Sequence, residues 1–193
     1  FSHMDPTRLS YASLGLQKQM PAYLFDTIPD TDIRKSLFVA PGDSTWFDPW
    51  GTAVPTYVSV KYTTPSWAAD YIMMRAAEMY MIEAEAAAEA GQEAVALAAV
   101  NAVVEARDPG RSISGSGEEL IQAIRLERRI ELWGEGFGLF DIKRWKIPLN
   151  RVDHDPTLCL ETDIDANSYM FNLRVPQYEI DANDLLTEGD QID

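Results

Sequence analysis

The stretch from Glu118 to Lys146, EELIQAIRLERRIELWGEGFGLFDIKRWK, decides how this chain folds. Ser116 stands just before it, and Glu119 three residues later completes a capping-box pattern, so we expect a helix from about Gly117. Apolar residues recur every three or four positions and form one stripe along this helix, which Trp133 extends: Leu120, Ile121, Ile124, Ile130 and Leu132. The pattern predicts an amphipathic helix that packs against a core.

Charged residues of both signs lie between these apolar positions, and glycines follow them. Gly134, Gly136 and Gly138 are expected to end the helix. The charges are too many for a face that only meets water. We therefore interpret the region as an elbow locked by structural ion pairs, formed by Arg125, Glu127, Arg128, Arg129, Glu131, Glu135, Asp141 and Arg144.

Several of these residues carry a family resemblance. Arg128-Arg129-Ile130-Glu131-Leu132, Glu135-Gly136 and Phe140-Asp141-Ile142-Lys143-Arg144-Trp145 resemble the signature "ERR-x-EL…EG-x-R-x-x-DL-x-RW" of SusD/RagB-like nutrient-binding lipoproteins. Phe137 and Gly138 stand where that family often has arginine or histidine. The segment PQYEIDAN, residues 176–183, resembles the one that closes many SusD-like chains.

The resemblance implies a function and a cellular place. It implies non-enzymatic binding of a nutrient, most often a glycan or oligosaccharide, without a cofactor. It also implies delivery to a SusC-like TonB-dependent transporter at the outer membrane. Members of the family are much longer than 193 residues, so we expect residues 1–193 to be a single C-terminal portion of a SusD-like domain. The signal peptide and the lipid anchor are then expected in a missing N-terminal part, and this anchor is the expected membrane contact.

Composition excludes other partners. Asp and Glu total 31 against 16 Lys and Arg, and a formal charge of -15 would repel nucleic acid and anionic membrane surfaces. Cys159 is the only cysteine, so neither an internal disulfide nor a cysteine-based metal site is expected. No apolar run reaches the roughly 18 residues of a membrane span.

We expect a mainly α fold, a tetratricopeptide-like helical hairpin plus a further helix, with long irregular loops and little β structure. Residues 1–64 are rich in proline and are expected to be loops, with a strand over Val54–Tyr62. Residues 65–146 form the expected helical core, with helices over Trp67–Ala90 and Gln92–Arg107. Residues 147–193 are an irregular acidic segment, with a candidate strand over Tyr169–Val175.

The first of these helices carries two apolar stripes, which predicts that it is covered on both sides. One stripe consists of Trp67, Tyr71, Met74, Met81, Ala84 and Ala88. The other consists of Ile72, Ala76, Met79, Ile82 and Ala86. The many alanines would let neighbouring helices approach closely.

No catalytic or metal-binding pattern stands out. Glu127 and Glu131 lie four residues apart on one helix face, but arginines flank both and would lower their pKa values, whereas a general acid needs a raised pKa. The glycines at 134, 136 and 138 follow a helix and match no nucleotide-binding spacing. The run from Asp163 to Asn167 copies the first ligands of a calcium loop and then departs from it, which leaves a looser calcium site or a solvated loop as alternatives.

The loop from Pro41 to Gly51 has the clearest binding chemistry. Sugars present C–H faces that stack on aromatic rings, while their hydroxyls need planar polar partners. The loop and its neighbour Tyr57 supply both kinds of group, and the candidate ligand-binding residues are Trp46, Phe47, Trp50, Asp43, Asp48 and Tyr57. The alternative is that these rings plug the loop onto the helices.

The sequence leaves two alternatives to glycan binding open. A member of the same family that binds peptides would have the same sequence pattern. A helical-repeat scaffold that binds only protein would use the aromatic loop as core or interface. A hydrolase is a more distant reading, because no nucleophile is paired with a base.

Overall fold

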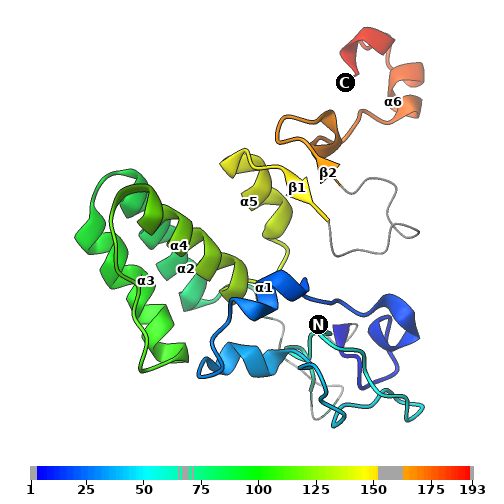
Figure 1. The fold of residues 1–193 in the computed structure, drawn as a ribbon. Coiled ribbons are helices and arrows are strands. Elements are labelled where there is room, and N and C mark those ends of the chain that lie inside the picture. Colours follow the sequence, from blue (N-terminus) through cyan, green and yellow to red (C-terminus); the bar gives the residue numbers. More distant parts are fainter. Residues whose placement is uncertain (1–3, 65, 67–69, 71, 152–162, 192–193) are drawn as a thin grey trace. The chain divides into compact units, whose positions relative to one another are not determined.

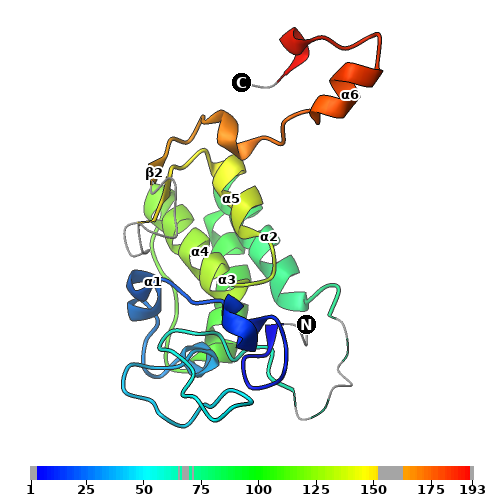
Figure 2. The ribbon, with the colours of Figure 1, turned by 90° about the vertical axis from the view of Figure 1, so that its right-hand side faces the viewer.

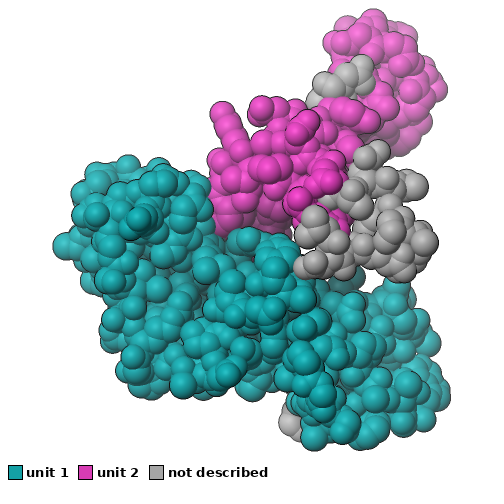
Figure 3. All heavy atoms as spheres, in the orientation of Figure 1, with its two compact units in different colours: residues 1–134 teal, residues 135–193 magenta. Residues whose placement is uncertain are grey.

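The computed structural model describes residues 4–64, 66, 70, 72–151 and 163–191 (Figure 1). The prediction of a mainly helical fold with little β structure is confirmed. The helices are α1 Ala22–Asp26, α2 Ala76–Glu89, α3 Glu93–Arg107, α4 Gly117–Glu131, α5 Gly138–Trp145 and α6 Gln177–Ala182, and the strands are β1 Leu149–Asn150 and β2 Asp163–Ile164. Two compact units, Phe1–Gly134 and Glu135–Asp193, divide the chain within the segment expected to be one helical core (Figure 3).

The core of the first unit is a bundle of three helices. α2 and α3 form the predicted hairpin, and Gly91, with φ +73, turns the chain between them. α2 packs against both α3 and α4, as the two views in Figures 1 and 2 also show. The buried core contains Ala77, Met81, Ala84, Ala87, Ala88, Ala96, Ala99, Val100, Val103, Val104, Leu120 and Ile124. Small alanine side chains bring the helix axes close together, so backbone and methyl groups fill the interior.

Helix α4 begins where the sequence predicted, but its cap differs from the expected one. Ser116 is the N-cap residue, and its side chain makes no capping hydrogen bond. The amide of Gly117 donates instead to Glu93 Oε1 of α3, at 2.8 Å. A carboxylate from a neighbouring helix satisfies this free amide, because negative charge is favoured at a helix N-terminus.

The expected helix over Trp67–Ala90 was too long at its N-terminal end. α2 begins at Ala76, and Arg75 before it is extended, with φ -128 and ψ 144. The Arg75 guanidinium binds Glu131 at the end of α4, and this tertiary contact holds the preceding chain away from the helix axis. Trp67 and Tyr71, assigned to this helix from the sequence, lie outside the described residues.

The two apolar stripes of α2 have different surroundings. Met81, Ala84 and Ala88 of the first stripe are buried, whereas Met74 is exposed. The second stripe is exposed in the described structure, with Met79 and Ile82 each 47% accessible. The prediction that α2 is covered on both sides was therefore wrong for the described part of the chain, because α3 and α4 pack on the same side of it.

The segment before α2 is mostly loop, as predicted, but the expected strand over Val54–Tyr62 is wrong. Only single bridges form, between Gln19 and Val58 and between Phe38 and Ser59. Tyr57 interrupts the strand because its φ is +66, a left-handed conformation that no continuous strand accepts. Buried Val54, Val58 and Val60 still form a small cluster with Val39.

The second unit contains the short elements after Gly134. β1 and β2 pair antiparallel, with Leu149 opposite Ile164. The expected strand over Tyr169–Val175 is wrong, since Tyr169–Phe171 is a single turn of 3-10 helix, in which the Met170 amide donates to the Ser168 side chain. Across the described residues of both units, no helix is long and apolar enough to span a membrane.

Candidate functional site

The aromatic loop forms a tight hairpin at its tip. Val54 N–H donates to the Trp46 carbonyl at 2.9 Å, and Phe47 and Ala53 form a bridge pair. Gly51 N–H donates to the Asp48 carbonyl at 3.1 Å and closes the turn. The turn consists of Asp48, Pro49, Trp50 and Gly51. Proline at its second position and glycine with φ +80 at its fourth suit a turn that ends in a left-handed residue. Residues 46–54 are called the aromatic hairpin below.

Asp48 organises this hairpin from inside. Its Oδ1 accepts from the amides of Trp50, at 2.9 Å, and Thr52, at 2.8 Å. Its own amide donates to the Thr52 carbonyl at 2.8 Å. A turn with this many hydrogen bonds has few alternative conformations, so Trp50 is presented with little freedom to lose on binding.

Asp43 holds the entrance to the hairpin in a similar way. Its Oδ1 accepts from the Thr45 hydroxyl at 2.7 Å and from the Thr45 amide at 2.8 Å. These two hydrogen bonds favour the ionised form and hold the pKa of Asp43 below its usual value. Both predicted aspartates thus have a structural role in the loop, because each accepts hydrogen bonds from backbone amides.

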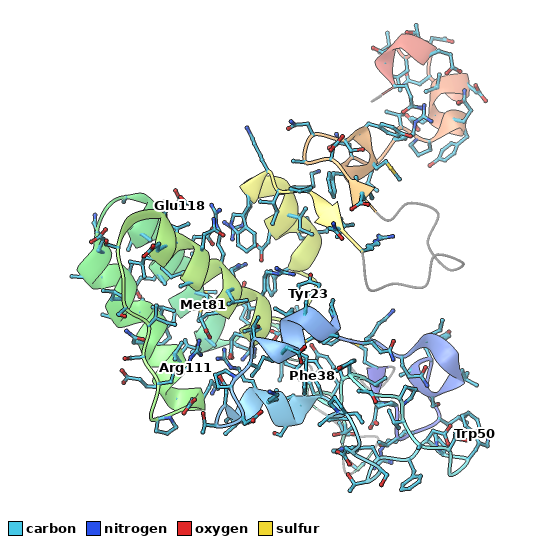
Figure 4. The ribbon with its side chains drawn as sticks, in the orientation of Figure 1. Tyr23, Phe38, Trp50, Met81, Arg111 and Glu118 are labelled. Carbon is cyan, nitrogen blue, oxygen red and sulfur yellow. The ribbon has the colours of Figure 1, made fainter. Side chains whose placement is uncertain are left out.

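The predicted ligand-binding rings separate into two pairs. Phe47 and Trp50 are exposed, with 49% and 58% of their surfaces accessible. Trp46 is half-buried against the valine cluster, and Tyr57 packs against Phe25 with 5.1 Å between ring centroids. Figure 4 shows Trp50 at the outer edge of the loop-rich segment. The first pair is free to stack on a ligand, while the second pair holds the loop in place.

The charged face of α4 is buried, and its partners come from distant parts of the chain. Glu127 is fully buried, and it accepts from Arg34 Nη2 at 2.7 Å and from Arg111 Nη2. Arg34 also binds Asp32 through Nε and Nη2. We call Asp32, Arg34, Arg75, Arg107, Arg111, Glu127 and Glu131 the ionic brace. It ties the loop-rich segment, the α2–α3 hairpin and α4 together.

Glu131 is the most heavily paired carboxylate of the brace. It binds Arg75 Nη1 and Arg107 Nη2, each at 2.8 Å, and Arg34 Nη1 at 3.4 Å. Burial alone would raise its pKa, but the hydrogen bonds and charges of Arg107 and Arg75 outweigh burial and lower the pKa of Glu131 to about 2. A buried carboxylate with so low a pKa stays ionised at neutral pH, so it has no proton to give as a general acid.

The end of α4 is capped by cations. Lys61 Nζ donates to the carbonyls of Glu131, at 3.1 Å, and Trp133, at 3.2 Å, and Arg75 Nη2 donates to the Glu131 carbonyl at 2.9 Å. Positive charge is favourable here, since the last carbonyls of a helix lack partners within it. Gly134 then turns the chain with φ +76.

Some of the other residues assigned to the elbow have partners on other elements. Arg125 binds Glu89 of α2 at 3.0 Å, and Arg129 donates to the Tyr23 hydroxyl at 3.0 Å. Arg128 is buried, while Glu135 begins the second unit. Asp141 is also buried and binds Arg144 at 2.8 Å within α5. The elbow as a set stays a prediction, while the ion pairs of Glu127 and Glu131 are formed with arginines from other segments.

Sequence reasoning missed five members of the ionic brace: Asp32, Arg34, Arg75, Arg107 and Arg111. One signal was available, because cations are scarce in this acidic chain and Arg107 and Arg111 flank the break at Asp108-Pro109-Gly110. Their distance in sequence from α4 gave no indication of the pairing. Separations such as 93 residues, between Arg34 and Glu127, leave no periodic trace.

A hollow of about 610 Å³ in the second unit contains the run that resembled a calcium loop. Pro148, Asp163, Asp165, Asn167 and Met170 are among its lining residues. Within residues 4–151 and 163–191, as far as they are described, no group of three or more His, Cys, Asp or Glu side chains is placed to hold a metal ion. The spacing in the sequence is therefore not matched by a converging set of ligands there.

The fold and the site together define a helical protein in which the charged motif braces the interior and aromatic rings reach the surface. Residues 44–188 match the model of the SusD family, and the chain belongs to this family. The resemblance noted in the sequence is thereby confirmed. Among curated protein sequences, none matches this chain.

Two solved structures from Bacteroides vulgatus are similar to the chain. One is a SusD-like carbohydrate binding protein with 26% sequence identity and a TM-score of 0.69, and the match covers 87% of this chain and 41% of that one. The other has 24% sequence identity and a TM-score of 0.64, and the match covers 88% of this chain and 37% of that one. At this identity it supports the fold alone. The chain thus spans less than half the length of these proteins.

Proposed function

We propose that this protein captures a glycan or oligosaccharide without altering it chemically, and that Trp50 and Phe47 provide the stacking surface. Family membership supports nutrient binding, and the Bacteroides vulgatus relative is described as carbohydrate binding. The observation that carries the proposal is the exposure of two aromatic rings on a hydrogen-bonded turn.

The geometry of the aromatic hairpin suits a sugar. An indole ring stacks on the C–H face of a pyranose, and each such contact adds to the apolar area removed from water. The free oxygens of Asp43 and Asp48 lie on the same short segment and can accept from sugar hydroxyls. Because the turn is held by backbone amides, binding would order little additional chain.

The state of two acidic residues on α4 supports the proposal of a non-enzymatic role. Glu127 and Glu131 are at most 4% accessible and are bound by arginines, so neither can reach a glycosidic bond. Their chemistry is structural, since removing a partner from a buried ion pair costs stability.

The cellular part of the proposal rests on the family. SusD-like proteins are in general associated with the outer membrane surface, and we propose the same place for this protein, with delivery of the glycan to a SusC-like TonB-dependent transporter. The test is proteolysis of intact cells followed by detection of the protein. Cleavage without lysis supports surface exposure, whereas protection until lysis contradicts it.

The binding claim is tested by isothermal titration of the purified protein with libraries of neutral oligosaccharides and of oligopeptides. We expect binding to at least one oligosaccharide, weakened roughly five- to thirtyfold by Trp50→Ala and by Phe47→Ala, since a lost stacking contact is worth about 1–2 kcal/mol. Tyr178→Ala is the matched control, because Tyr178 is another exposed ring, 72% accessible, on α6 of the second unit.

Two outcomes would overturn the proposal. Binding of peptides alone would make the protein a peptide-binding member of the family. If glycan binding is unchanged in both hairpin variants, the stacking surface does not include Trp50 or Phe47. The thermal unfolding temperature of each variant should match that of the parent protein, because the substituted rings are exposed.

A further inference from the structure

We infer that the aromatic hairpin selects uncharged glycans and discriminates against glycans that carry carboxylate or sulfate groups. This inference rests on the proposed function, and it specifies the chemical class of the ligand. It follows from the charges that surround Trp50 and Phe47 and from the rigidity of the turn that holds them.

The segment that contains the hairpin carries negative charge only. Residues 36–60 include no lysine, arginine or histidine. Their two acidic side chains are Asp43 and Asp48. A neutral or hydroxyl-rich ligand meets only acceptors there. An anionic ligand meets two carboxylates and no compensating cation from the same segment.

The turn keeps one of these charges beside the stacking surface. Asp48 Oδ1 lies 2.9 Å from the Trp50 amide nitrogen and 2.8 Å from the Thr52 amide nitrogen, so the carboxylate cannot swing away without breaking the turn. Asp43 is fixed by Thr45 in the same manner, and these hydrogen bonds keep it ionised. A ligand stacked on Trp50 is therefore close to a fixed negative charge.

Lys35 and Lys61, which border the segment, are engaged elsewhere. Lys35 Nζ binds Asp30 at 2.7 Å and the Ile28 carbonyl at 2.8 Å. Lys61 Nζ caps the end of α4. Lys18 is exposed and joins the segment through its backbone, where its carbonyl accepts from Ser59 rather than from the hairpin turn. None of the three shares the hydrogen-bonded turn that holds Trp50.

Simple electrostatics sets the size of the effect. Charges within about 10 Å interact before they are screened at 0.1 M salt, and exposed pairs are worth less than about 1 kcal/mol each. Two fixed carboxylates should therefore weaken binding of an anionic glycan by roughly three- to tenfold. Because the charges are exposed, the discrimination should shrink as salt concentration rises.

The experiment compares one ligand in two forms. A neutral oligosaccharide that binds is oxidised at its primary hydroxyls to carboxylates, and both forms are titrated into the protein at 20 mM and 500 mM salt, which changes the screening length about fivefold. We expect the oxidised form to bind roughly three- to tenfold more weakly at low salt and the difference to become smaller at high salt.

A charge-neutral variant assigns the effect to the hairpin. Asp43→Asn with Asp48→Asn keeps Oδ1 as a turn acceptor and removes both charges. The readout is the ratio of the affinities for the neutral and the oxidised ligand, which should approach one in this variant. Glu83→Gln with Glu105→Gln is the control, since these exposed side chains on α2 and α3 change the net charge by the same amount. This control should leave the ratio unchanged.

Each contrary result has a distinct meaning. Equal binding of the two ligand forms at low salt overturns the inference and leaves glycan binding intact. If the control variant also removes the difference in affinity between the two ligand forms, the assignment to Asp43 and Asp48 is wrong. Failure of every oligosaccharide to bind overturns the proposed function itself, and the inference falls with it.

Discussion

The ionic brace and the aromatic hairpin invert the usual distribution of residue types. In the brace, Glu127 and Arg34 are at most 3% accessible, while in the hairpin Trp50 is 58% accessible. Charged groups are normally found in water and large aromatic rings in the core. The motif richest in charge therefore lies inside the protein, whereas the rings proposed to bind the ligand lie at its surface.

The physical reason lies in what each region leaves unsatisfied. In the brace, each carboxylate is matched by guanidinium groups that can form several directed hydrogen bonds. In the hairpin, the backbone is satisfied by Asp48, yet the rings of Phe47 and Trp50 keep apolar surface in contact with water. Covering that surface with a ligand is favourable, whereas opening the brace is not.

The strongest test of the comparison is Glu127→Ala. It leaves the buried Arg34 and the partly exposed Arg111 with one partner fewer, and we expect it to lower the free energy of unfolding by about 3–5 kcal/mol, as measured by chemical denaturation. Glu118→Gln is the control, because Glu118 is an exposed acid of the same helix and should change stability by less than about 0.5 kcal/mol. Equal effects would contradict a structural role for the brace.

Acid should weaken the brace in a defined pH window. The pKa of Glu131 is lowered from 4.5 to about 2, so its contribution is fully present above pH 4.5 and is lost as pH falls toward 2. A shift of this size corresponds to about 3 kcal/mol. The measurement is the unfolding free energy between pH 7 and pH 2 for the parent and for Glu131→Gln.

The variant should begin less stable and should lose less stability over this window than the parent does. Identical pH dependence in the two proteins would show that other carboxylates control acid unfolding.

Trp46→Ala should separate the two kinds of ring in the hairpin. Trp46 packs on the cluster of Val39, Val54, Val58 and Val60, so its removal should cost about 2 kcal/mol of stability. Trp50→Ala should leave the unfolding temperature unchanged, because the ring is exposed. The check is thermal unfolding of both variants, and a larger loss for Trp50→Ala would reverse the roles.

Gly51→Ala probes the rigidity of the turn and should give the smallest effect. Gly51 has φ +80, and an added Cβ would meet no atom within 4 Å, so the cost is backbone strain of about 1 kcal/mol. We expect a small drop in unfolding temperature together with weaker glycan binding.

Gly138→Ala is the matched control for this substitution, since a Cβ there also meets nothing within 4 Å and φ is not positive. It should be neutral or slightly stabilising, because alanine is the better helix former. If Gly138→Ala loses as much stability as Gly51→Ala, the effect of Gly51→Ala does not come from backbone strain in the turn.

Local patterns predicted the helices well where packing agreed with them. The bounds of α3 and the start of α4 follow from periodicity, caps and breakers, which act within a few residues. The predicted helix from Trp67 failed because a tertiary ion pair holds Arg75 extended. The strand near Tyr57 failed because Tyr57 has a left-handed φ of +66, a conformation that its residue type does not indicate.

The sequence by itself determined the helical class, the family, and the segment that carries exposed aromatic chemistry, because these depend on residue order and short spacings. Tertiary structure alone decided which arginines neutralise Glu127 and Glu131, and which rings of the hairpin are free. Both choices depend on contacts between residues far apart in the chain, such as Arg34 and Glu127. Such contacts are selected by the free energy of the whole packed arrangement, and no local pattern records them.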